Sequence, residues 1–284
     1  MQVAKTPGSA RAQARGLARP LALVPTMGAL HAGHRSLLMR ARRENSGLAA
    51  SLFVNPLQFG AGEDFERYPR SFEGDAAQFE AAGVDLLYAP SASEMYPPAF
   101  STSIEVGALG SVFEGDVRPG HFAGVATVVA KLLTTIEPTR LYLGEKDVQQ
   151  TAVVRRMVRD LDLPVEVVVC PTVREPDGLA LSSRNAYLDA AQRAAAPSFY
   201  RALEAAARSL ERDGSQERAL AAGRLVLEPP LQWDYLAVVD PLSFEAKSVP
   251  HGPSLIIGAV RAGRTRLIDN LTVDVPSLQT VGRG

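Results

Sequence analysis

Leu-Ala-Leu-Val-Pro-Thr-Met-Gly-Ala-Leu-His-Ala-Gly-His, residues 21–34, is the stretch of this sequence that decides its fold. Its first four residues are an apolar run of the kind that forms a buried strand in a parallel sheet. Pro25 is expected to end strand pairing, because proline has no N–H to donate to a ladder. Gly28 and Gly33 allow a tight turn, and residues 34–43 are rich in helix formers. The stretch therefore predicts a strand, a glycine turn and a helix, in this order.

A helix that begins near His34 would direct free backbone N–H groups and the positive end of its dipole at an anion, most often a phosphate. His31 and His34 lie three residues apart at this point. Two imidazoles beside a helix N-terminus favour a phosphate-binding site. The alternative is an ordinary strand–helix unit whose histidines lie on the surface.

The composition is that of a globular protein with enough material for one large or two modest domains. The 284 residues are 46% hydrophobic and 21% charged, and the formal net charge of −1 gives no reason to expect nucleic acid or an anionic membrane as a partner. The single cysteine, Cys170, excludes an internal disulfide and fits a cytoplasmic location. Its valine neighbours predict a buried structural thiol. No apolar run approaches the ~20 residues that cross a bilayer.

Strands and helices alternate through residues 1–172, which predicts right-handed βαβ crossovers and a parallel sheet. The expected fold class is α/β, with a Rossmann-like, doubly wound sheet domain. After the first strand, we expect strands at residues 48–54, 84–89, 141–143 and 165–169, and helices at residues 72–82, 125–136 and 148–161. The glycine-rich region 107–124 is expected to be a mobile loop. The basic residues 1–20 indicate a short helix or a frayed terminus rather than a targeting segment.

Residues 173–284 are expected to form a smaller C-terminal α+β domain that acts as a lid over the site. Asp177-Gly178 predicts a hairpin turn, because this pair supplies the positive φ that such turns need. The alanine-rich residues 190–214 predict one long helix. Strands are expected at residues 233–239, 254–260 and 265–268.

Polar residues gather where the predicted strands end, and such ends converge on one crevice in a doubly wound sheet. The clusters are His31/His34, Asn55/Gln58, Arg118/His121, Lys146/Gln149/Gln150 and Ser182/Ser183/Arg184. Cations, imidazoles and hydroxyls together suit a polyphosphate, whose developing charge must be spread during transfer. Each cluster also has a plainer explanation as a solvated charge group, a turn, a helix cap or surface amides. Neither of the common glycine-rich nucleotide motifs nor a histidine or cysteine metal motif is present.

Several strings along the chain resemble, in the same order, the pantoate–β-alanine ligase family, which belongs to the nucleotidyltransferases with a His-x-Gly-His motif. The strings are residues 25–34, 53–59 (Phe-Val-Asn-Pro-Leu-Gln-Phe), 118–122 (Arg-Pro-Gly-His-Phe), 144–150 (Gly-Glu-Lys-Asp-Val-Gln-Gln), 177–185 (Asp-Gly-Leu-Ala-Leu-Ser-Ser-Arg-Asn) and 265–270 (Thr-Arg-Leu-Ile-Asp-Asn). The resemblance runs from about Leu21 to Val275, nearly the whole chain. It does not extend to the residues before Leu21.

The resemblance implies an ATP-dependent condensation of (R)-pantoate with β-alanine through a pantoyl adenylate. The products would be pantothenate, AMP and diphosphate, in the biosynthesis of vitamin B5 and coenzyme A. It implies ATP as a substrate, Mg²⁺ to neutralise the polyphosphate, and a cytoplasmic homodimer that binds only small molecules, without nucleic acid or membrane partners. Residues 1–172 would bind nucleotide and pantoate. The resemblance assigns no metal ligands.

Carried over residue by residue, the resemblance assigns an ATP site. Its members would be Met27, Gly28, Ala29, Leu30, His31, Ala32, Gly33, His34, Gly144, Glu145, Lys146, Asp147, Val173, Leu181, Ser182, Ser183 and Arg184. Within this set the catalytic residues would be His31 and His34, which contact phosphates, and Lys146, which bridges the phosphates and the pantoate carboxylate. His34 would also donate a proton. Gln58 and Gln150 would hold pantoate, and Gln58 would reach β-alanine. Ala32 stands where many relatives have an acid, so it has no individual role.

Three alternative functions stay open at this point. A nucleotidyltransferase that moves AMP or CMP onto a phosphorylated acceptor would share the histidine motif, but Asn55, Gln58 and Gln150 suit a small polar acid better than a phosphate ester. A nonenzymatic nucleotide-binding protein would keep the glycines without needing the histidine pair. An aminoacyl-tRNA synthetase is disfavoured, because the chain is short and shows no basic face for RNA.

Overall fold

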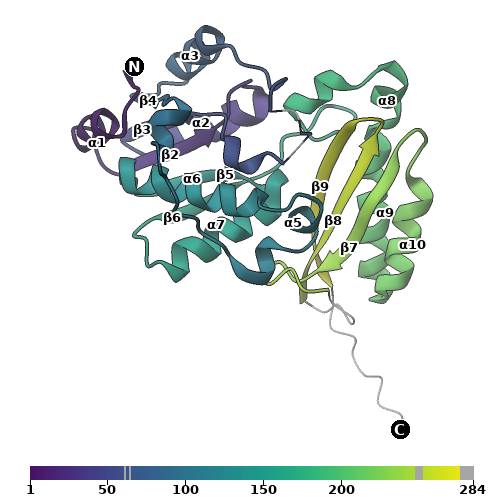
Figure 1. Ribbon diagram of the computed structural model, residues 1–284. Coiled ribbons are helices and arrows are strands. Elements are labelled where there is room, and N and C mark those ends of the chain that lie inside the picture. Colours follow the sequence, from purple (N-terminus) through teal and green to yellow (C-terminus); the bar gives the residue numbers. More distant parts are fainter. Residues whose placement is uncertain (61, 64, 247–251, 276–284) are drawn as a thin grey trace. The chain divides into compact units, whose positions relative to one another are not determined.

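A computed structural model describes residues 1–60, 62–63, 65–246 and 252–275, and the chain divides into two compact units, Met1–Val173 and Arg174–Gly284 (Figure 1). The strands of the first unit are β1 (Gln2–Ala4), β2 (Leu21–Thr26), β3 (Gly47–Leu52), β4 (Leu86–Tyr88), β5 (Arg140–Gly144) and β6 (Glu166–Cys170). Its helices are α1 (Pro7–Arg15), α2 (Ala32–Glu44), α3 (Phe72–Ala81), α4 (Ala92–Met95), α5 (Glu114–Val117), α6 (His121–Ile136) and α7 (Val148–Asp160), with short 3-10 turns η1 (Pro56–Gln58), η2 (Gly107–Gly110) and η3 (Glu145–Asp147).

The six strands of the first unit form one parallel sheet in the order β1-β4-β3-β2-β5-β6. α2 and α3 lie together on one face, where Leu38 and Phe79 are buried in the same core as Tyr142 of the sheet. α1 and α7 each pack against α6 in a separate layer (Figure 1). The predicted α/β class and the doubly wound, Rossmann-like sheet are confirmed.

β2 extends beyond its predicted end, and the prediction that Pro25 ends strand pairing is wrong. Pro25 pairs in register with Ser51 of β3. Leu21 exchanges hydrogen bonds with Thr139, which lies just before β5. Because the backbone groups of a strand point to alternate sides, Pro25, four residues after Leu21, faces the same side, toward β5. The register between β2 and β5 stops at Leu23, which puts the missing N–H of Pro25 beyond the end of that ladder. A proline at such a position costs no sheet hydrogen bond.

The prediction of a loop over residues 107–124 is wrong, because η2, α5 and the first turn of α6 occupy this region. α6 begins at His121, and Gly124 therefore lies inside the helix. A Cβ on Gly124 would come within 2.3 Å of the Leu57 carbonyl oxygen, so this glycine allows α6 to approach η1 closely. Glycines that serve close packing and glycines that serve loops look alike in a single sequence.

The N-terminus is not a frayed end. β1 pairs with β4 at the edge of the sheet, with Val3 opposite Leu87. The expected short helix follows as α1, whose N-cap Thr6 accepts the N–H of Ser9 at 3.2 Å. The three residues of β1 are too few to show a strand period in the sequence.

The second unit is a small α+β domain, as predicted. Its antiparallel sheet consists of β7 (Gln232–Val239), β8 (Gly252–Ala262) and β9 (Thr265–Val275), and α9 (Pro197–Asp213) and α10 (Gln216–Val226) pack along it (Figure 1). β9 is longer than predicted. The single helix predicted for residues 190–214 is instead α8 (Ala190–Ala195) followed by α9, because Pro197 has no N–H with which to continue a helix. The predicted turn forms with Gly178 at a φ of 94°.

None of the helices in the described part of the chain combines the length and the hydrophobicity that a bilayer span requires.

Candidate active site

The carboxyl ends of β2 and β5 carry the two segments with the strongest sequence signal. The chain leaves β2 toward β3 on one side and later enters β5 on the other side, so the strand order reverses between these neighbours. Leu23 pairs with Leu141, and this register carries the segment after Thr26 to a position beside the segment after Gly144. Open α/β sheets bind their ligands at such a switch point.

α2 begins with a reciprocal cap formed by two histidines. His31 is the N-cap residue, and its Nδ1 accepts the N–H of Gly33 at 3.1 Å. Nδ1 of His34 accepts the N–H of His31 at 3.4 Å, and the two ring centroids lie 4.2 Å apart. These hydrogen bonds assign the ring proton to Nε2 in both residues. Two Nε2–H donors therefore lie side by side at the positive end of the helix.

Both imidazoles are neutral at physiological pH. Burial, followed by the neighbouring His31, lowers the pKa of His34 to about 3. Burial and the positive charge of Lys146 lower the pKa of His31. His34 is therefore suited to donate a hydrogen bond through Nε2–H, and a proton-releasing imidazolium is not its state near pH 7. The register of β2 with β5 brings the turn after β5 beside the histidine pair, and the charges of Lys146 and Asp147 act on the pKa of both rings.

Lys146 lies in η3, directly after β5. Its Nζ is 3.6 Å from Asp147 Oδ1, and its side chain is only 20% exposed. A fully solvated charge cluster, the plainer explanation of this string, does not fit that burial. One ammonium and two neutral imidazole donors at one edge of the sheet suit a polyphosphate.

The turn between β2 and α2 is held by a residue that the sequence alone did not reveal. Gly28 has a φ of 86° and Ala29 a φ of 51°, so two successive residues take the left-handed conformation. The buried carboxylate of Asp75, in the first turn of α3, accepts the N–H of Ala29 at 3.0 Å and the N–H of Leu30 at 2.9 Å. A Cβ on Gly28 would lie 2.7 Å from Asp75 Oδ2, which excludes a larger residue.

Hydrogen bonds fix the amide of Gln58 at both of its ends. Asn55 Nδ2 donates to Gln58 Oε1 at 3.1 Å, and Gln58 Nε2 donates to the sulfur of Met27 at 3.1 Å. The hydroxyl of Tyr96 holds Asn55 in turn by donating to its Oδ1 at 2.8 Å. This network assigns the amide orientation and directs the NH₂ group of Gln58 toward Met27. Met27 thereby joins the predicted nucleotide segment to the predicted pantoate residue.

Arg118 and His121 support Gln58 from its backbone. Nη2 of Arg118 and Nδ1 of His121 bond the Gln58 carbonyl oxygen at 3.1 and 2.7 Å. Arg118 also forms a two-pronged ion pair with Glu63, at 2.8 and 2.6 Å. Burial and the charge of Arg118 lower the pKa of His121 to about 4, so its neutral ring donates through Nδ1–H. These residues hold the loop that carries Gln58 and are not merely loop surface.

Comparison with known proteins gives the same assignment as this geometry. A model of the pantoate-beta-alanine ligase family matches residues 2–272. This chain belongs to the pantoate-beta-alanine ligase family. Pantothenate synthetase from Chloroflexus aurantiacus is 55% identical over 262 residues, which cover 91% of this chain and 93% of the relative. The synthetase from Thermus thermophilus is 55% identical over 253 residues, 88% of this chain and 92% of the relative.

Solved ligase structures share the fold of both units. Pantothenate synthetase from Thermus thermophilus matches with a TM-score of 0.91 and 52% identity over 95% of this chain and 99% of that one. Pantoate-beta-alanine ligase from Francisella tularensis, solved with beta-gamma ATP and beta-alanine, matches with a TM-score of 0.79 and 34% identity over 95% and 97% of the two chains.

Among the two neighbouring glutamines after β5, only Gln150 remains a candidate pantoate ligand of the ligase. Gln149 is buried, and its Nε2 donates to the carbonyl oxygens of Leu109 and Val112 at 3.0 and 2.8 Å. Its Oε1 accepts the N–H of Glu114 at 3.2 Å. Gln149 therefore holds the segment that contains η2 and α5. Although it belongs to the polar cluster predicted at the strand end, its amide bonds the protein itself and is not a candidate to bind substrate.

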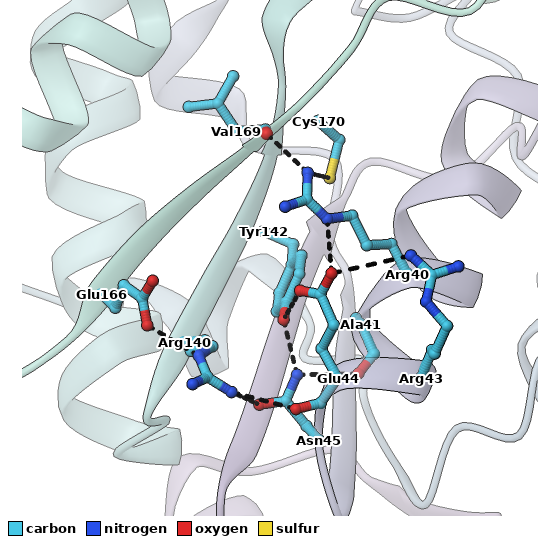
Figure 2. Close-up of polar contacts among 10 residues, drawn as sticks. All are labelled: Arg40, Ala41, Arg43, Glu44, Asn45, Arg140, Tyr142, Glu166, Val169 and Cys170. Atoms are coloured by element: carbon cyan, nitrogen blue, oxygen red, sulfur yellow. Dashed lines mark hydrogen bonds and ion pairs between the residues drawn. The ribbon is translucent and has the colours of Figure 1, made fainter.

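A polar cluster fixes the C-terminal half of α2 against β5 and β6 of the ligase (Figure 2). The hydroxyl of Tyr142, whose ring is buried in β5, donates to Glu44 Oε2 at 2.9 Å and accepts from Asn45 Nδ2 at 2.7 Å. Arg40 donates to the Val169 carbonyl oxygen at 3.0 Å. Since α2 carries the histidine pair at its other end, this cluster sets the position of the pair relative to the turn after β5.

The other predicted ATP residues of the ligase are described within their own units. Val173 is the last residue of the first unit. In the second unit Ser182 caps η4 (Ser183–Tyr187), and its Oγ accepts the N–H of Arg184 at 3.2 Å. Leu181, Ser182, Ser183 and Arg184 are all partly buried. A helix cap, the plainer explanation of this string, is therefore present, and ATP binding by these residues stays a prediction.

Over the described residues, no group of three or more histidine, cysteine, aspartate and glutamate side chains is arranged to hold a metal ion.

Proposed function

We propose that this protein joins pantoate to β-alanine at the expense of ATP in two steps. The match to the ligase family over residues 2–272 supports the overall reaction. In the first step the pantoate carboxylate attacks the α-phosphorus of ATP, which forms pantoyl adenylate and releases diphosphate. In the second step the amine of β-alanine attacks the acyl carbon and displaces AMP. Dividing the reaction into these two steps is chemically reasonable, because a free carboxylate is a poor acylating agent whereas AMP is a good leaving group.

The observation that carries this proposal is the neutral histidine pair beside Lys146. Negative charge moves onto the leaving diphosphate as the bond to the α-phosphorus breaks. The Nε2–H groups of His31 and His34 and the ammonium of Lys146 supply preorganised donors for this charge. Because the imidazoles are fixed in the helix cap, they need no reorganisation during the reaction.

The fixed amide of Gln58 supports its role in binding pantoate. One N–H of the amide contacts Met27, and the second N–H would donate to an oxygen of the acid. Gln150 would hold the opposite side of pantoate, and Gln58 would also reach β-alanine. Holding the carboxylate near the α-phosphorus converts the first step into an effectively unimolecular reaction.

Mg²⁺ enters this proposal as part of the substrate. Among the described residues, no three or more carboxylate, imidazole or thiol side chains are grouped so as to hold a metal ion. The ion would arrive on the phosphate oxygens of ATP and neutralise part of their charge.

ATP–diphosphate isotope exchange tests the proposal, measured with pantoate in the presence and absence of β-alanine. Exchange that requires pantoate but not β-alanine is the expected result and demonstrates the acyl-adenylate step. Amide formation without exchange would instead indicate a concerted or ordered reaction. ATP binding without any diphosphate release would favour a nonenzymatic nucleotide-binding protein, and the ligase proposal would be wrong.

Two further expectations concern the protein as a whole. We expect a homodimer, from the family resemblance, and light scattering of the purified chain would test it. We expect a cytoplasmic location, because the single cysteine fits a reducing compartment, and cell fractionation would test that.

A further inference from the structure

We propose that Asp75 is a positioning residue that places the turn Met27–Leu30 for both ATP and pantoate without touching either substrate. This inference rests on the proposed function, because it concerns the same site. Its starting point is a carboxylate that is only 3% exposed and that no step of the reaction uses.

Each oxygen of this carboxylate accepts one backbone N–H of the turn. Oδ2 accepts from Ala29 at 3.0 Å, and Oδ1 accepts from Leu30 at 2.9 Å. Successive backbone N–H groups in such a turn form a concave nest that attracts an anion. Asp75 already fills this nest, and hydrogen bonds to an ionised acceptor are stronger than those between neutral groups. The left-handed conformation of Ala29, at a φ of 51°, is stabilised by the same contact.

The first consequence concerns how phosphate is bound. A glycine turn that precedes a helix usually offers its own N–H groups to phosphate. Here the N–H groups of Ala29 and Leu30 are committed to Asp75, so these two residues shape the ATP site without donating to it. The donors for phosphate are instead the imidazoles of the α2 cap and Lys146.

The second consequence is that one anchor serves two substrates. Met27 stands at the start of the anchored turn, and its sulfur accepts the Nε2–H of Gln58 at 3.1 Å. His31 stands at the end of the turn and caps α2. If the turn shifts, Met27, which orients Gln58, and His31, which would donate to phosphate, move together.

The decisive variant is Asp75→Asn, which keeps the shape of the side chain but replaces one acceptor oxygen by an NH₂ group that faces a backbone N–H. We expect KM for ATP and KM for pantoate each to rise about tenfold, the effect of losing one hydrogen bond to a charged group. A purely structural role would lower stability and leave both KM values unchanged.

Asp85→Asn is the matched control. The Asp85 carboxylate also accepts a backbone N–H, from Leu48 at 2.8 Å, together with Nη1 of Arg42 at 2.8 Å, but it does not contact the turn. We expect a comparable loss of stability with both KM values unchanged. A folded Asp75→Asn variant with the KM values of the unsubstituted protein for both substrates would overturn the proposal.

Hydrogen exchange in the unsubstituted protein tests the anchor even if Asp75→Asn fails to fold. The amides of Ala29 and Leu30 should be protected without nucleotide, and adding ATP should leave their protection unchanged. Protection that appears only with ATP would mean that these amides bind phosphate, and the anchor would be wrong. This result is independent of turnover, so a protein that lacks ligase activity but shows the protected amides would contradict only the proposed function.

Discussion

At the scale of single residues, the site depends on imidazoles that are kept neutral. His34 combines a pKa of about 3 with an Nδ1 that is already occupied by a backbone N–H. Its chemistry at neutral pH is therefore hydrogen-bond donation. The expectation that His34 also delivers a proton stays a prediction.

Removing one of the proposed phosphate donors tests this assignment. We expect His34→Ala and Lys146→Ala each to slow ATP–diphosphate exchange by about 10²–10³, the usual effect of losing a preorganised donor. Folding should stay intact, as checked by circular dichroism, because neither side chain belongs to the core. If either variant exchanges at close to the rate of the unsubstituted protein, the substituted residue does not act as a phosphate donor in the reaction.

The neutral histidines also make stability depend on pH. The pKa of His121 falls from 6.5 in the unfolded chain to about 4 in the folded protein, so the unfolded state binds the extra proton between these values. The free energy of unfolding therefore rises with pH through this range, and the contribution of His121 reaches its full value above about pH 6.5. We expect urea midpoints to fall between pH 7 and pH 5, and to fall less in His121→Asn, which still offers a donor to the Gln58 carbonyl oxygen. Equal falls in both proteins would contradict the assignment.

Most residues of the candidate site could be proposed from the sequence, but Asp75 could not, for a physical reason. His31, His34, Lys146 and Gln58 stand beside glycines and strand ends, which are local signals. Asp75 lies 46 positions from the turn that it anchors, and an aspartate in the first turn of a helix is common. Only the folded chain brings its carboxylate to the turn.

At the scale of elements, the contact between α6 and η1 supports Gln58, the predicted pantoate residue. The backbone of Gly124 leaves no room for a Cβ beside the Leu57 carbonyl oxygen, and its own carbonyl oxygen accepts a hydrogen bond from Asn55 Nδ2 at 3.0 Å. A side chain here would push α6 away from the loop that carries Gln58. The sequence placed this glycine in a loop, because spacing alone does not distinguish a turn from a close helix contact.

Gly124→Ala tests this packing, and Gly8→Ala is its control. A Cβ on Gly124 would lie 2.3 Å from backbone oxygen, so we expect loss of stability by more than about 1 kcal/mol and a raised KM for pantoate. Gly8 lies in helix α1 with nothing within 4 Å of a Cβ, so alanine there should stabilise by about 0.5–1 kcal/mol. Urea unfolding and steady-state kinetics measure both effects. Equal behaviour of the two variants would contradict the close-packing argument.

At the scale of the whole molecule, the fold was the most predictable feature. Apolar runs alternate with helical segments over the first unit, and this order leaves few topologies beyond a doubly wound parallel sheet. The topology then predicts where ligands bind, because the order reverses between β2 and β5. β1 was not predictable, since its three residues become a strand only through their contact with β4.

The prediction that belongs to this scale is participation of the second unit in ATP binding. Leu181, Ser182 and Arg184 are expected to contact the nucleotide, and the Arg184 amide donates to Ser182 Oγ at 3.2 Å. We expect ATP to slow hydrogen exchange over residues 181–184, because ordering of this segment by phosphate adds protection beyond the cap. Peptides from β7 should stay unchanged and serve as the internal control. Unchanged exchange over residues 181–184 at saturating ATP would confine nucleotide binding to the first unit, and the lid role of the second unit would be wrong.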